Sequence, residues 1–305
     1  MRSTHWQFAI ASATVAIFTA LGLPAASRPD SIGARAHGNR DLPVRDQETI
    51  RKSFDLAGAA PLRLEVDNVN GSIEVVGVDS SQVQLVLIRS TRAESQAKLD
   101  EARKEVTLDI KQEAGLLSLY VDGPFRCRCS DRHSVSFRED EGYWVEMDFQ
   151  LQVPRNIDLN LRTVNSGDIN VRDVKGAYSV RNVNGGIEML RVAGSGTAHT
   201  VNGGVRVTFR ENPRENSSFK SINGDIDLYF ARDLAADFRF KTFNGAIYSD
   251  FVVTSLPARA METQRKGGKT VFRSDRFTSA RVGAGGIEIK AENLNGDIRI
   301  RENKD

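Results

Sequence analysis

Five basic residues recur at one position of a repeated sequence pattern and could together bind an anionic ligand. Each lies three residues before an asparagine of the repeat; they are Arg162, Arg181, His199, Lys220 and Lys241. Like charges on neighbouring strands repel, so a stacked line of cations is costly unless an anion neutralises it. The matching partner is a linear polyanion. The alternative is a solvated face neutralised by an acidic column, to which Glu188 and Asp227 could contribute.

Carboxylates at another position of the repeat define a second candidate site. Asp168, Asp225 and Asp297 follow turn glycines, and stacked carboxylates can hold calcium or act as acid and base on a polysaccharide. The chain would then be a carbohydrate-active β-helix enzyme, a lyase or a hydrolase. Glycine, alanine and serine occupy the same position in other repeats, however, and aspartate often bonds turn backbone. We therefore expect no enzyme, no catalytic residue and no cofactor.

Cysteine and histidine add little chemistry. Cys127 and Cys129 lie in a polar segment that also contains His133. A disulfide within the loop is the favoured state, and free or mixed thiols and a metal site remain alternatives. Two thiols and one imidazole lack the fourth ligand of a zinc site, so we expect no bound metal. No nucleophile-elbow motif accompanies His199, which argues against a Ser-His-Asp assembly.

An Asn-Gly repeat must position these residues. Its pattern is apolar, Asn, Gly, small or Asp, apolar, variable, apolar, and successive copies from Ile169 to Ile247 are 18 or 21 residues apart. The structural turn residues are Asn184, Gly185, Asn202, Gly203, Asn223, Gly224, Asn244, Gly245, Asn295 and Gly296. Asn-Gly favours a tight turn, and the alternation after it favours a strand. Equal spacing predicts a parallel β-solenoid with coils of about 18–21 residues; an antiparallel β-sandwich is the alternative.

Two further columns follow from this register. The residues two before each asparagine are small and polar, and alternation turns them inward, where they are expected to bond along the column. They are Asn68, Thr163, Asn182, Thr200, Ser221, Thr242 and Asn293. In the strands after the turns, Glu188, Arg206 and Asp227 should face outward and alternate in sign.

The Asn-Gly ladder, together with Val153-Pro154, Asp158–Leu161 and the closing Gly283–Ile289 segment, resembles a bacterial family of unknown function that is labelled putative adhesin. The resemblance covers roughly residues 60 to 301. It implies a β-solenoid behind a signal peptide or membrane anchor. Its motifs are specific for fold and weak for function, and the cysteine-containing segment departs from the pattern.

The chain divides into four expected parts. Arg2, the apolar run from Phe8 to Leu23 and the small residues after it have the layout of a signal peptide, residues 1–27. An uncleaved anchor is the alternative, although the apolar run is slightly short for a membrane span. Residues 28–49 are expected to form a disordered linker, and residues 50–160 a β-rich half with one short helix at 93–106 and the cysteine loop. Residues 161–301 form the repetitive part of this all-β fold.

The charge balance limits the class of partner. The chain has 42 basic and 40 acidic residues and a net charge of +2, which does not favour nucleic acid. We expect an exported, non-catalytic envelope protein, periplasmic or on the cell surface, that binds an envelope polymer or a surface protein. Membrane contact is expected only through the N-terminal segment, if that segment is uncleaved.

Overall fold

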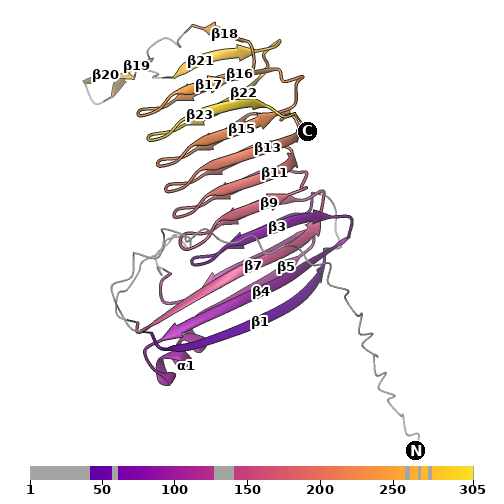
Figure 1. Ribbon diagram of the computed structural model, residues 1–305, viewed down its shortest axis with the longest axis vertical. Helices are drawn as coiled ribbons and strands as arrows, with labels where there is room; N and C mark the ends of the chain where they lie inside the picture. Colours follow the sequence, from indigo (N-terminus) through magenta and orange to yellow (C-terminus); the bar gives the residue numbers. More distant parts are fainter. Residues whose placement is uncertain are drawn as a thin grey trace, which may run out of the picture.

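Two large β-sheets and one short helix make up the fold of this protein in the computed structural model (Figure 1). The structure describes residues 42–56, 61–126, 141–257, 262–266, 269–273 and 277–304. A separate hairpin of β19 (Glu262–Lys266) and β20 (Lys269–Arg273) pairs only with itself. The predicted all-β class with a single short helix in the N-terminal half is confirmed within the described residues.

The ten-stranded sheet, called the front sheet after its position in Figure 1, is mostly parallel. Its strands run in the order β1 (Val44–Asp55), β4 (Gln82–Ala93), β7 (Tyr143–Pro154), β3 (Ile73–Val78), β9 (Ile169–Arg172), β11 (Ile187–Ala193), β13 (Val205–Glu211), β15 (Ile226–Phe230), β23 (Ile298–Glu302) and β17 (Ile247–Ser249). Only the pairings of β1 with β4 and of β4 with β7 are antiparallel.

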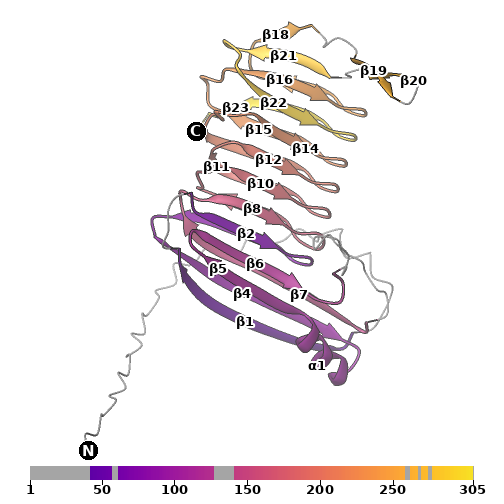
Figure 2. The ribbon, with the colours of Figure 1, turned by 180° about the vertical axis from the view of Figure 1, so that it is seen from behind.

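The eleven-stranded sheet, called the rear sheet, faces the viewer in Figure 2. Its order is β18 (Val253–Leu256), β21 (Thr278–Val282), β16 (Ala236–Lys241), β22 (Ile287–Glu292), β14 (Ser217–Lys220), β12 (Gly196–His199), β10 (Tyr178–Arg181), β8 (Asp158–Arg162), β2 (Arg63–Asp67), β6 (Leu116–Asp122) and β5 (Thr107–Glu113). The strands from β16 to β6 are parallel, and antiparallel strands close both ends.

The Asn-Gly turns carry the chain from the rear sheet to the front sheet. The turn after β10, for example, leads into β11, so it does not join neighbouring strands of one sheet as a hairpin would. Ile187 pairs with Ile169 on one side and with Val205 on the other, which is the 18-residue spacing of the sequence. Equivalent residues of these repeats therefore lie side by side, and these turns do not form hairpins.

The C-terminal repeat leaves the sequence order. Strands β22 and β23 enter the stack between the repeat of β14 and β15 and the repeat of β16 and β17 (Figures 1 and 2). Strand β21 then lies antiparallel on the other side of β16 and carries the edge strand β18. Simple extrapolation of the repeat, one layer after another, is wrong at this end.

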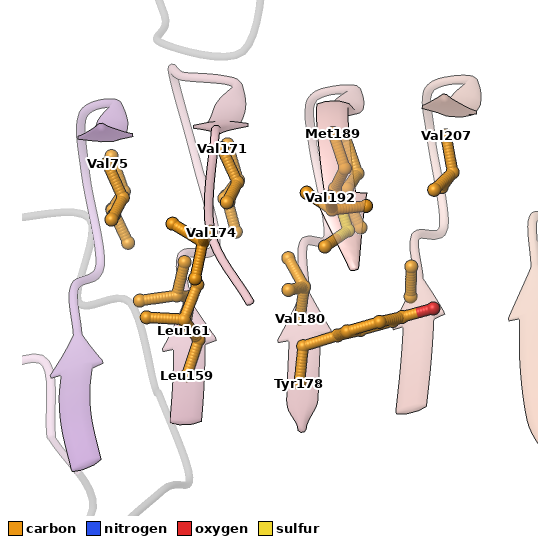
Figure 3. Packing of buried hydrophobic residues seen from close by; sticks show 14 of the residues in the cluster. Val75, Leu159, Leu161, Val171, Val174, Tyr178, Val180, Met189, Val192 and Val207 are labelled. Atoms are coloured by element: carbon orange, nitrogen blue, oxygen red, sulfur yellow. The ribbon is translucent and has the colours of Figure 1, made fainter. Parts of the chain in front are cut away.

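A continuous apolar core lies between the two sheets. Val75, Val171 and Val207 come from front strands and face side chains such as Leu161 and Val180 from rear strands (Figure 3). Toward the C-terminal repeats the filling becomes aromatic; the rings of Phe209 and Phe230 stack with centroids 4.9 Å apart. Burial of this kind is the main source of stability in a stack of repeats, each of which is too thin to fold alone.

Six of the seven residues of the inward polar column are buried and Thr242 is partly exposed, but the column does not bond along itself. Thr163, Thr200 and Ser221 donate to turn carbonyls of the neighbouring layer, those of Gly71, Gly185 and Gly203, at 2.9, 2.7 and 2.8 Å. The reason is that the carbonyls of the turns point inward and would otherwise lack donors. The side-chain ladder runs instead through the turn asparagines, where Asn202 donates to Asn184 and Asn223 to Asn202, both at 2.8 Å.

The N-terminal half differs from expectation at its boundaries. The predicted linker, residues 28–49, is wrong from Val44 onward, because β1 begins there and pairs along its whole length with β4. As an edge strand it exposes most of its side chains, which gives it a polar sequence. The helix α1 (Gln96–Glu105) is shorter than predicted, since Ala93 belongs to β4 and Ser95 is its N-cap.

Two predictions lie outside the described residues. These are the signal peptide at 1–27 and the cysteine pair, Cys127 and Cys129, with the neighbouring His133. Within the described part of the chain, no helix has the length and hydropathy needed to cross a membrane.

Candidate ligand-binding face

Four of the five predicted basic residues stack on the outer face of the rear sheet. Parallel register pairs Arg162 with Arg181, Arg181 with His199, and His199 with Lys220. Neighbouring strands lie about 4.8 Å apart, so the four residues form a row about 14 Å long. We call this row, Arg162, Arg181, His199 and Lys220, the cation ladder.

The fifth residue, Lys241, is not continuous with the ladder. Glu292 on the inserted strand β22 pairs with Lys220 on one side and with Lys241 on the other. At the opposite end Arg162 pairs with Asp67. A carboxylate therefore closes each end of the ladder. The sequence contains a signal for the place of Glu292, because an acidic residue in a column of cations is most stable between two of them.

No ion pair neutralises the ladder among the residues that the structure describes. Glu188 and Asp227, the proposed neutralising groups, lie on the front sheet, where Arg206 is between them at 3.7 and 4.0 Å. They cannot screen a row on the other sheet at contact distance, so that part of the solvated-face explanation is wrong. The same ion pairs confirm the predicted alternation of sign along the front column.

His199 is the one member of the ladder that is both half-buried and titratable near neutral pH. Burial lowers the pKa of His199 below its ordinary value, and the charges of Arg181 and Lys220 lower it further. Its Nε2 atom lies 3.3 Å from the Ser218 hydroxyl. At neutral pH the ladder therefore carries three permanent charges and one imidazole that is mostly uncharged.

A second outward column runs beside the ladder. Its members lie two residues before the cations on the same strands and in the same register; they are Asn160, Ser179, Thr197 and Ser218. We call them the polar column. Apart from the contact between Ser218 and His199, the structure gives their side chains no hydrogen-bond partner among the described residues. Cations and free hydrogen-bonding groups thus share one face.

The aspartates of the repeat bind the backbone of the neighbouring layers. Asp168, Asp225 and Asp297 each accept a backbone N–H from the next layer, those of Gly186, Asp297 and Ala246, at 2.7 to 2.9 Å. Arg299 also binds Asp225 at 2.6 Å, and this hydrogen bond holds the pKa of the Asp225 carboxyl below its ordinary value. A general acid needs the opposite shift.

A groove of about 590 Å³ lies on the front sheet between these aspartates. It exists where Gly186 and Gly204 replace the side chains found at the same position in other repeats. Asp168 and Asp225 are three layers apart, about 14 Å, which exceeds the carboxylate separations that glycosidases use. In the described residues, no three of His, Cys, Asp and Glu gather as metal ligands would. Glu188 and Asp227 also line the groove, and both are ion-paired with Arg206.

Comparison with known proteins adds little. No family model and no curated protein matches the chain. Among solved structures, a putative cell adhesion protein from Clostridium sporogenes is similar at 11% identity and a TM-score of 0.38, over 85% of this chain and 100% of the other.

A putative adhesin from Bacteroides fragilis follows at 10% identity and a TM-score of 0.31, over 84% and 97% of the two chains. A putative lipid binding protein from Parabacteroides distasonis has 12% identity and a TM-score of 0.29, over 83% and 96%. Likenesses this low carry no argument about fold or function.

Proposed function

We propose that this chain is an exported, adhesin-like binding module of the cell envelope, without catalytic activity, and that it binds a linear anionic polymer along the cation ladder. Its repeats are proposed to form a parallel β-solenoid of 18–21-residue coils. The periplasm or the cell surface is the proposed location, and the polymer would then be a component of the envelope.

The contrast between the two sheets carries the proposal. In the outward column of the front sheet, Glu188, Arg206, Asp227 and Arg299 alternate in sign, and each has a partner of opposite sign in an adjacent layer. On the rear sheet four basic residues stack without an ion pair among the described residues. The same repeat thus allows both arrangements, and the unpaired one costs folding free energy that a bound anion would recover.

The regular spacing of the ladder favours a polymer over a small anion. Successive cations are one strand apart, at about 4.8 Å, and strands packed into a sheet hold that spacing rigidly. A chain of acidic groups can occupy several of these positions at once. Each further contact is then intramolecular, which raises the affinity without any new kind of interaction.

The test is retention on a column of immobilised anionic polymer at low salt. Replacing Arg181 and Lys220 by Gln removes two permanent charges from exposed positions, so the fold should persist while retention falls strongly. The matched control replaces Arg172 and Arg210, two exposed residues of the front sheet, by Gln and changes the net charge equally. Equal retention of both double variants would contradict the proposal.

A further inference from the structure

The polar column gives the cation ladder a second chemistry. Asn160, Ser179 and Thr197 each lie two residues before a cation on the same strand and point outward beside it. Hydroxyl and amide groups both donate and accept hydrogen bonds. A ligand lying across the four strands would therefore meet a row of charges and, about 7 Å away along the strands, a row of hydrogen-bonding groups.

Different polyanions would use this face differently. A polyphosphate offers only charged oxygen atoms and no donor, so it can exploit the cations but only part of the polar column. A nucleic acid gains affinity from base stacking on aromatic rings. The outward side chains of β8, β10, β12 and β14 include no Phe, Tyr or Trp, and His199 is the one ring among them. An acidic polysaccharide carries carboxylates together with many hydroxyl groups, and so complements both rows.

We propose that the ligand of this face is an acidic polysaccharide, with its carboxylates on the cation ladder and its sugar hydroxyls on the polar column. This rests on the proposed function, because it names the class of polymer that the ladder binds. Asp67 and Glu292 interrupt the row of cations at its two ends, and each is itself ion-paired, Asp67 with Arg126 at 2.9 Å and Glu292 with Lys290. The uninterrupted row of cations spans about 14 Å, which matches the length of a few sugar units.

The test compares two polymers on the full chain by calorimetry, namely polygalacturonate and inorganic polyphosphate at equal charge concentration. Ser179→Ala together with Thr197→Val removes two hydroxyls and keeps a branched side chain in β12. Each lost hydrogen bond is worth roughly 1 kcal/mol, so the loss of two should lower the affinity for polygalacturonate about thirtyfold. The affinity for polyphosphate should fall clearly less, because the cations remain and a phosphate can only accept hydrogen bonds from these hydroxyls.

Three results would overturn the inference. If the double variant binds polygalacturonate like the parent, the polar column does not contact the sugar. If polyphosphate binds through the ladder and polygalacturonate does not bind, the polyanion function stands and the polysaccharide assignment is wrong. If neither polymer binds, the proposed function itself fails. Circular dichroism of the double variant, matched to the parent, checks that a loss of affinity is not a loss of fold.

Discussion

Within the cation ladder, His199 decides how many charges a ligand meets. Arg162, Arg181 and Lys220 are charged throughout the physiological range, whereas the imidazole has its pKa lowered by burial and by its two cationic neighbours. A bound polyanion offsets the repulsion and favours the imidazolium. Binding and protonation of His199 are therefore coupled, and each strengthens the other.

This coupling gives a pH dependence with a definite sign. As the pH falls from about 8 to below the pKa of His199, which is lower than its ordinary value, the imidazole gains a proton, and the affinity for a polyanion should rise several-fold. His199→Gln should bind with an affinity that changes little over this range. Polyanion titrations at both pH values measure the effect, provided the polymer stays ionised. An identical pH profile for parent and variant would show that another group is responsible.

The lowered pKa of His199 also means that the protein without ligand becomes less stable as the pH falls. The pKa of His199 is lower in the folded protein than its ordinary value of 6.5, so the unfolded chain binds the proton more readily. Stability is therefore lost as the pH falls through 6.5 toward the folded-state pKa. Without ligand, His199→Gln should lose less stability than the parent over this interval.

Arg206 tests the charge alternation on the front sheet. It lies between Glu188 and Asp227, and Arg206→Glu would place three like charges in adjacent layers. We expect a loss of about 0.5 to 1 kcal/mol, reduced by added salt because the side chain is exposed. Denaturant unfolding at two salt concentrations measures it. A variant as stable as the parent at low salt would mean that the ion pairs are not formed in solution.

At the scale of the element, the turns explain why glycine recurs. Gly203 has a φ of +152°, and a Cβ there would lie 2.3 Å from the Gly185 carbonyl oxygen. Gly185 has no such φ, yet its Cβ would lie 2.2 Å from the Gly167 carbonyl oxygen. The Asn-Gly motif thus predicted the turns correctly. It could not show that close approach between layers, as well as backbone conformation, requires the glycine.

Gly203 and Gly186, in the turns of two neighbouring layers, give a matched pair of variants. Gly203→Val should cost roughly 1 to 3 kcal/mol from backbone strain, and the carbonyl contact adds to this cost. Gly186→Ala should be nearly neutral, because its nearest contact would be an ordinary 3.5 Å and its φ is not in the left-handed region. Thermal melts followed by circular dichroism compare them. Equal melting temperatures for the two variants would refute the turn geometry.

At the scale of the whole molecule, the insertion of the C-terminal repeat is the feature that the sequence could not predict. Ile298 lies 72 residues after Ile226, yet the two pair directly, and Ile298 also pairs with Ile247. Every repeat has the same pattern, so any of them fits beside any other, and spacing alone favours sequence order. The sequence did predict the all-β class and the register from Ile169 to Ile226. It also predicted the four residues of the cation ladder, because in this part of the molecule the layers follow the order of the chain.

The inserted strand β23 should hold the end of the stack together. Ile298 is fully buried, and Ile298→Ala should cost about 2 to 5 kcal/mol by leaving a cavity between two layers. Leu294→Ala, at a side chain that is 44% exposed in the same repeat, serves as the control and should cost little. Hydrogen exchange should show β15 and β17 losing protection together in Ile298→Ala. Loss confined to β17 would place β23 elsewhere.

The salt dependence of polymer binding tests the central claim most directly, because its slope counts the cations that contact the polymer. With three permanent charges at neutral pH, the logarithm of affinity should fall with the logarithm of salt concentration at a slope of about −2. Arg181→Gln together with Lys220→Gln should reduce the magnitude of this slope to less than about 1. Arg172→Gln together with Arg210→Gln should leave the slope unchanged. The same slope in all three proteins would contradict the assignment of the cation ladder as the binding site.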